Sequence, residues 1–261
     1  MEPLAKKKEG TITISIILPV LNEANLIVQT LSALQPLRAS GHEVIVVDGG
    51  STDATVLLSQ PFSDRVISSH RGRSLQMNAG AHAAEGDILL FLHADTFLPK
   101  GAPRLILEGL KQQGKCWGRF NVQLSGRHFF LRIVEHLMNW RSQYTGIATG
   151  DQAIFVWRQL FETIGGFPCI DLMEDIALSK ILKHYSRPLC LHQRVITSSR
   201  RWENNGVLHT ILHMWQLRLA YALGADPRRL VQLYPPSQKT TPAGRNGLQR
   251  AVTDFPVDDC G

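Results

Sequence analysis

Residues 86–95 of the chain read GDILLFLHAD, and this stretch decides the fold. Its apolar run, residues 88–92, starts after Gly-Asp and ends abruptly at His93, Ala94 and Asp95. A short unbroken apolar run between polar borders is typical of a central strand that is buried on both faces. Ligands of open α/β sheets bind just outside the carboxyl ends of such strands. The sequence therefore places Asp95 where a carboxylate can hold a metal ion and, through it, a phosphate.

A lone aspartate after a strand more often only stabilises the turn that follows, here before Thr96. Two other predicted strands, residues 11–20 and 43–47, also end in polar clusters, at Asn22-Glu23 and at Asp48. The carboxyl ends of parallel strands lie at one edge of a sheet. This clustering favours a nucleotide site at that edge over a simple turn.

Strand and helix patterns alternate over residues 11–100, which predicts βαβ units and an open, mostly parallel sheet flanked by helices. Ser51 or Thr52 is expected to cap the helix that runs to Gln60. Further strands are expected at residues 65–68, 115–124, 153–157 and 188–196, and further helices at residues 26–36, 74–85, 129–140, 173–185 and 206–223.

The composition fits one globular domain. The chain has 261 residues, of which 44% are hydrophobic, so it can bury a sizeable core. Its net charge of +6 suits anionic partners, but no basic stripe interleaved with aromatic residues indicates nucleic acid. Residues 1–10 are expected to be a flexible tail, and the polar, Pro/Gly-rich residues 235–261 a disordered one.

The cysteines and the hydropathy pattern predict a cytoplasmic protein. The four cysteines show no CxxC spacing and are interpreted as reduced thiols. We expect no signal peptide, and no apolar run reaches the about 20 residues of a spanning helix. The protein is expected to be soluble or to lie on the cytoplasmic face of a membrane.

Five motifs in order give the chain a family resemblance, namely Pro19-Val-Leu-Asn22-Glu23, Val47-Asp48-Gly-Gly-Ser-Thr-Asp53, Gly72-Arg73 with Asn78-Ala-Gly80, His93-Ala-Asp95, and Glu174-Asp175. Their order and spacing resemble a family 2 glycosyltransferase of the GT-A fold. The strings GRSLQMNAGA, FLHAD and SSRRWE resemble its arsenosugar-biosynthesis-associated branch, and some relatives carry carotenoid-glycosyltransferase labels. The resemblance implies one domain over residues 11–230, with a nucleotide-binding half at 11–100 and an acceptor-side half at 101–230.

The resemblance also implies which residues bind the nucleotide of the donor. A carboxylate such as Glu23 or Asp48 accepts hydrogen bonds from ribose hydroxyls or a base N–H, and a helix N-terminus with Arg73 suits a diphosphate. The alternative for Asp48 is that it only forms the Asp-Gly-Gly turn. The expected nucleotide-binding residues are Pro19, Asn22, Glu23, Asp48, Gly50, Arg73, Asn78 and Ala94.

The family's metal motif, DxD, is altered in this chain. Asp95 matches its last aspartate, which implies a Mg²⁺ or Mn²⁺ ion that bridges the diphosphate. His93 stands in place of the first aspartate. It is either a second ligand, which would favour Mn²⁺, or a packed and hydrogen-bonded histidine.

Glu174 and Asp175 match the acidic pair on the acceptor side, which implies that Asp175 is the general base of an inverting transfer. Their alternative role is to stabilise a helix N-terminus. The donor sugar or acceptor is expected to contact Gly150, Asp151, Gln152, Arg201 and Trp202. Ser198 replaces the glutamine of the QxxRW motif of processive synthases, which favours transfer of a single sugar.

The two amphipathic helices, residues 129–140 and 206–223, are most simply core-packing elements. Their aromatic and basic residues also allow contact with a membrane and a lipid acceptor. The expected reaction moves one sugar from a nucleoside diphosphate sugar, by default a UDP-sugar, to a hydroxyl of a small-molecule or lipid acceptor. A nucleotidyltransferase would need a glycine-rich, basic first loop, and an inactive binding module would not need both Asp95 and Asp175.

Overall fold

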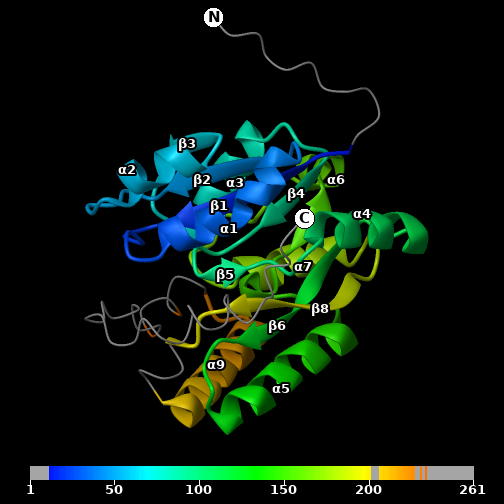
Figure 1. Ribbon diagram of the computed structural model, residues 1–261. Helices are drawn as coiled ribbons and strands as arrows, with labels where there is room; N and C mark the ends of the chain where they lie inside the picture. The colour runs from blue at the N-terminus through cyan, green and yellow to red at the C-terminus, as the bar shows by residue number, and fades with distance from the viewer. Residues whose placement is uncertain (1–11, 201–205, 227–229, 231–232, 234–261) are drawn as a thin grey trace, which may run out of the picture.

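An eight-stranded mixed sheet forms the centre of the molecule (Figure 1), in the order β3-β2-β1-β4-β7-β6-β8-β5. The computed structural model describes residues 12–200, 206–226, 230 and 233. The strands are β1 (Ile14–Val20), β2 (Glu43–Asp48), β3 (Arg65–Ser68), β4 (Ile88–Phe91), β5 (Thr96–Phe97), β6 (Trp117–Leu124), β7 (Phe155–Trp157) and β8 (Leu189–Thr197).

The first four strands form a fully parallel unit. β1 lies between β2 and β4, and β3 continues the sheet beyond β2. These strands are short β-branched and apolar runs, and β1, β2 and β4 are buried almost throughout, as strands covered on both faces should be. The predicted βαβ arrangement is confirmed here. The carboxyl ends of β1, β2 and β4 therefore share one edge.

The remaining strands make the sheet mixed. β7 is antiparallel to both β4 and β6, β5 is antiparallel to β8, and β6 runs parallel to β8. The sequence reasoning did not predict β5, α4 (Ala102–Gln113) or α6 (Arg158–Thr163). β7 and β8 were predicted, and each ends within one residue of its expected carboxyl end.

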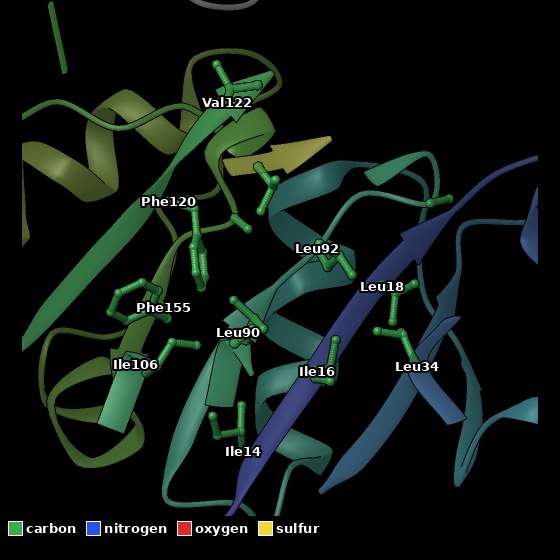
Figure 2. Close-up of a cluster of buried hydrophobic side chains, with 14 of the residues drawn as sticks. Ile14, Ile16, Leu18, Leu34, Leu90, Leu92, Ile106, Phe120, Val122 and Phe155 are labelled. Carbon is green, nitrogen blue, oxygen red and sulfur yellow. The ribbon is translucent and has the colours of Figure 1, made fainter. Parts of the chain in front are cut away.

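Helices cover both faces of the sheet and enclose two apolar cores. One core joins the sheet to α1 (Ile27–Ala39), α4 and α5 (Phe129–Thr145), and it includes the side chains drawn in Figure 2. The other joins the opposite face to α3 (Arg73–Ala83), α6 and α7 (Glu174–Leu182). Figure 2 shows Ile16 and Leu18 of β1 beside Leu90 and Leu92, which is why the central strands tolerate no polar residue on this face.

The predicted cap of the second helix is wrong. α2 (Thr55–Ser59) begins at Thr55, with Ala54 at the N-cap position and no side-chain cap bond. The Ser51 hydroxyl instead accepts a hydrogen bond from the Asn22 backbone N–H at 2.9 Å. Ser51 and Thr52 thus join the loops after β1 and β2. A short 3₁₀ turn, η1 (Gln60–Phe62), follows α2.

The expectation that α5 and α9 (Val207–Ala222) serve core packing is wrong for several of their apolar residues. Leu131, Val134 and Met138 of α5 are buried, as expected of a packed face. On α5, four other large side chains are exposed, namely Phe129, Phe130, Ile133 and Leu137, and on α9 Trp215 and Leu219 are exposed while Leu217 is buried. The side chains of Leu208, Ile211 and Leu212, and the predicted tails at 1–10 and 235–261, lie outside the described residues.

Cys116, Cys169 and Cys190 are free thiols, and Cys260 falls in the part that is not described. In the described chain, none of the helices combines the length and apolar character that crossing a bilayer requires.

The His42 side chain makes the stability of the fold pH-dependent. Its Nδ1 accepts a hydrogen bond from the Ile14 backbone N–H at 3.2 Å, and burial lowers the pKa of His42. Because the folded pKa lies below that of the unfolded chain, the stabilisation is complete above about pH 6.5 and is lost as the pH falls from there through the folded pKa.

We therefore predict that His42→Asn, which retains an acceptor without a titrating ring, loses less stability than the wild type between pH 7 and pH 5. Urea unfolding at the two pH values measures this difference. His70→Asn, at an exposed loop position, is the matched control. An identical pH dependence for His42→Asn and the wild type would contradict the assignment.

Candidate active site

The Asn22 side chain joins the loops after β1 and β2, and the Asp48 side chain closes the turn after β2. The carboxylate of Asp48 is buried and accepts hydrogen bonds from the backbone N–H groups of Gly50 and Ser51, each at 3.0 Å. Asn22 has a positive φ of 55°, and its Oδ1 accepts from the Thr52 N–H at 2.8 Å. Asp48 thus forms the Asp-Gly-Gly turn, and its nucleotide contact stays a prediction.

Gln76 of α3 supports the same two strand ends, and sequence reasoning missed it. Its Nε2 donates to the carbonyl oxygens of Val20 and Val47, both at 2.9 Å. A Cβ at Gly49 would lie 2.9 Å from Gln76 Cδ, so this glycine is required for close approach. The available signal was a polar residue on the buried face of an amphipathic helix, whose amide needs buried carbonyls as partners.

Arg200 lies between two of the predicted acidic residues. Its Nη2 is 4.0 Å from Glu23 Oε2 and 3.7 Å from Asp95 Oδ2, and its Nε donates to Ser198 Oγ at 3.0 Å. Burial, with the negative charge of Asp95 next in importance, raises the pKa of Glu23 to about 7. The carboxyl ends of β1 and β4 therefore bring two acids together, and Arg200, which the sequence did not indicate as a site residue, bridges them.

The described residues contain no cluster of three or more His, Cys, Asp or Glu side chains able to hold a metal ion by themselves. Mg²⁺ is usually held by one or two carboxylates together with substrate phosphates, so a single aspartate suffices when the metal enters with a diphosphate. Asp95, partly exposed beside Glu23, fits that mode.

His93 is packed rather than open. Its Nδ1 is 3.3 Å from Asp151 Oδ1, and a Cβ at Gly150 would lie 2.5 Å from its Nε2. Both ring nitrogens thus face protein groups. This arrangement matches the packed, hydrogen-bonded histidine, which the sequence offered as the alternative to a metal ligand. Metal ligation by His93 would require one of these contacts to be given up.

Glu174 and Asp175 begin α7 and face a small pocket that His93 and Gly150 also line. Asp175 Oδ2 accepts from the Gly150 N–H at 2.9 Å, and Oδ1 accepts from the Ile176 N–H at 2.7 Å. Glu174 is buried, and this burial, with the adjacent charge of Asp175, raises the pKa of Glu174. Burial and like charge thus both disfavour the ionised form of Glu174.

Arg73 stands opposite this pair at the start of α3. The surrounding protein acts to lower the pKa of Arg73, but the charges of Glu174, Asp151, Asp175 and Asp95 outweigh that effect and raise it. Its side chain remains exposed to solvent. One accessible cation therefore faces both the acids after β4 and those of α7.

Other predicted residues have supporting roles in the structure. Asn78 forms two hydrogen bonds of 2.8 Å with the backbone N–H and carbonyl of Phe167, and the Ala94 carbonyl accepts from Thr30 Oγ1 at 2.5 Å. Gln152, in the 3₁₀ turn η2 (Gly150–Gln152), is fully buried, with its amide directed to Thr149 and Asn139. Substrate contact by Gln152 would require it to leave these partners. Pro19 lies in β1 opposite Val47, and Arg201 and Trp202 fall outside the described residues.

A family model described as Glycosyl transferase family 2 matches residues 15–164, which is more than half of the chain. The chain belongs to glycosyl transferase family 2. Among curated proteins, it is 27% identical to "Probable glycosyltransferase YdaM" of Bacillus subtilis over 81% of its own length and 54% of the relative. It is 29% identical to the poly-beta-1,6-N-acetyl-D-glucosamine synthase of Staphylococcus aureus over 39% of its length and 26% of that protein. The chain thus spans about half or less of the curated relatives it matches.

Solved structures share the fold of this family 2 chain. A mannosyltransferase from Pyrobaculum calidifontis, in complex with GDP-Man and Mn²⁺, matches with a TM-score of 0.58 and 19% identity over 85% of this chain and 68% of that one. Glucosyl-3-phosphoglycerate synthase from Mycobacterium tuberculosis, with Mn²⁺, UDP and phosphoglyceric acid, matches with a TM-score of 0.56 and 19% identity over 82% and 80%. The fold is therefore the predicted GT-A fold.

The Asn78 contact predicts a loss of stability on substitution. In Asn78→Ala, the Phe167 backbone N–H and carbonyl lose their partner, which should lower the free energy of unfolding by about 1–3 kcal/mol. Asn78→Asp keeps the acceptor for the Phe167 N–H, so its free energy of unfolding should lie between those of the wild type and Asn78→Ala. Denaturant unfolding measures both variants. Wild-type stability in Asn78→Ala would show that this contact does not hold the loop.

Proposed function

We propose that the protein is an inverting, metal-dependent glycosyltransferase that moves one sugar from a nucleoside diphosphate sugar to an acceptor hydroxyl. The observation that carries this proposal is a pocket lined by Glu174 and Asp175 of α7, together with the charge of Arg73, which interacts with this pair and with Asp95 after β4. Family membership supports it, as do solved structures whose titles name GDP-Man or UDP together with Mn²⁺.

In this proposal the strand-end loops bind the donor. Glu23 and Asp48 are placed for the nucleoside, Arg73 and the N-terminus of α3 for the diphosphate, and Asp95 for Mg²⁺ or Mn²⁺. The metal, when bound, neutralises charge on the departing diphosphate. UDP is our default, and the narrower likeness to the arsenosugar-associated branch stays a prediction that rests on its sequence strings.

Asp175 is the proposed base that takes the proton of the acceptor hydroxyl. Both of its oxygens are held by backbone N–H groups, so its orientation is fixed before substrate binds. Burial and the adjacent charge raise the pKa of Glu174, which disfavours its ionised form. We therefore propose Asp175, which lines the same pocket, as the base. A single displacement with this base inverts the anomeric centre, and we propose that Gly150, Asp151, Arg201 and Trp202 surround the reacting sugar.

We predict that Asp175→Asn lowers turnover by about 10²–10⁴-fold and leaves nucleotide binding intact, because only proton removal is lost. Because the acceptor is not identified, the assay measures slow hydrolysis of UDP- and GDP-sugars in the presence of Mn²⁺. The nucleoside diphosphate that is released gives the rate. Asp171→Asn, an exposed residue four positions earlier, is the control. Undiminished hydrolysis in Asp175→Asn would remove Asp175 from the reaction.

The same assay separates the alternatives. A nucleotidyltransferase would consume a nucleoside triphosphate and release pyrophosphate, whereas a binding module would bind the nucleotide sugar and release nothing. The proposed transferase hydrolyses the nucleotide sugar to nucleoside diphosphate and free sugar and releases no pyrophosphate.

We further propose that the protein works at the cytoplasmic face of a membrane and that its acceptor is either a small molecule or a lipid. Support comes from what we call the aromatic face, the exposed residues Phe129, Phe130, Ile133, Leu137, Trp140 and Tyr144 of α5. Trp140 stacks on Tyr144 at 5.7 Å, and cations stand at both ends of the helix, Arg127 at its start and Arg187, which donates to the Tyr144 carbonyl, at its end. Aromatic residues between cations suit an anionic lipid surface.

Vesicle sedimentation tests this contact. Vesicles of phosphatidylcholine with phosphatidylglycerol should bind the protein. The double variant Phe129→Ser with Trp140→Ser should bind about tenfold or more weakly, because two exposed aromatic groups that would enter the lipid are lost. Leu57→Ser, at an equally exposed apolar position on α2, should change little. Equal binding by all three proteins would show that the aromatic face does not contact lipid.

A further inference from the structure

Three arginines from different elements form a group near Asp175, in which the charge of Arg141 interacts with the other two and with Asp175. They are Arg119 of β6, Arg141 of α5 and Arg218 of α9. Arg119 Nη2 donates to the carbonyl of Asn139, on α5, at 3.1 Å. α5 and α9 lie side by side (Figure 1), and Leu217 packs against Met173 and Ile176 at the start of α7.

These arginines have buried N–H groups with no acceptor. The Nε atoms of all three, together with Arg141 Nη2, are inaccessible to solvent and make no hydrogen bond within the part of the chain that the structure describes. Buried donors are nearly always satisfied in folded proteins, and an unpaired guanidinium is especially costly. A group of such donors at one place indicates a missing acceptor.

The charge balance of this region is positive. Burial, followed by the nearby charge of Arg218, lowers the pKa of Arg141 to about 10, so it remains protonated at neutral pH. Asp175 interacts with both Arg141 and Arg218, but its two oxygens already accept N–H groups of Gly150 and Ile176. The available counter-charge is thus shared among several cations.

We propose that Arg141 and Arg218, with Arg119 beneath them, bind a phosphate group of the acceptor and thereby present its hydroxyl to Asp175. The inference rests on the proposed function and specifies its acceptor as a phosphate ester that also carries a free hydroxyl. Guanidinium groups match phosphate oxygens with paired hydrogen bonds, and a phosphate supplies the acceptors that the buried N–H groups lack. In this proposal Arg73 and Asp95 serve the donor and not the acceptor.

Calorimetry at saturating UDP and Mn²⁺ tests this site, because the donor diphosphate site is then filled. The soluble probe is glycerol 3-phosphate, compared with glycerol, and the lipid probe is phosphatidylglycerol vesicles, compared with phosphatidylcholine. At least one phosphate probe should bind, and which one binds identifies a soluble or a lipid source. Binding of glycerol 3-phosphate supports the site. Because the aromatic face can also bind phosphatidylglycerol vesicles, their binding supports the site only when Arg141→Gln or Arg218→Gln weakens it, and it counts against the site when neither does. Binding of neither phosphate probe overturns the site.

The arginine variants make the test specific. Arg218→Gln and Arg141→Gln should each weaken binding of the phosphate probe by about 10–100-fold, because each removes charge-assisted hydrogen bonds. UDP affinity should not change, and Arg104→Gln, exposed on α4, is the control. Unchanged binding of the phosphate probe in both Gln variants overturns the assignment.

A second measurement covers the case in which a variant does not fold. With UDP and Mn²⁺ bound, glycerol 3-phosphate or phosphatidylglycerol should raise the unfolding temperature of the wild type, and glycerol or phosphatidylcholine should not. No rise with either phosphate probe overturns the site. If UDP itself fails to bind, the proposed function fails; if UDP binds and the phosphate probes do not, only this inference fails.

Discussion

The parallel pairing of β1 with β2 and β4 is the constraint on which the rest of the molecule depends. In this register Val20 lies opposite Asp48, and Ile17 lies opposite Phe91, so the polar loops after all three strands leave the sheet at one edge. The pairing is stable only because both faces are covered by apolar helices. The site chemistry is therefore a consequence of where buried strands end.

Acids that meet at one edge of the sheet repel one another, and nearby arginines compensate this negative charge. Burial raises the pKa values of Glu23 and Glu174, and repulsion by the neighbouring Asp95 and Asp175 raises them further. Arg200 and Arg73 offset these charges from the solvent side, where a metal ion and a diphosphate can reorganise them. Near Asp175, the buried Arg141 and Arg218 create the opposite imbalance.

Much of this was predictable from sequence, and the failures share a physical origin. The run at residues 88–92 and the motifs after β1, β2 and β4 gave the parallel unit, because buried strands and strand-end polar residues leave local signals. The antiparallel β7, the Gln76 amide and the position of Arg200 depend on long-range contacts that no local pattern encodes. The apolar face of α5 was predicted, but periodicity alone does not tell a core from an exposed surface, and Phe129 is exposed.

The most direct test of the account is metal-dependent nucleotide binding. UDP, GDP, CDP and ADP would be titrated by calorimetry, with and without Mn²⁺, into the wild type and Asp95→Ala. The account predicts that one nucleotide binds tightly only with the metal, and that Asp95→Ala loses this dependence because the carboxylate holding the ion is gone. Failure of every nucleotide to bind with metal present, or equal metal-dependent binding by Asp95→Ala, would contradict it.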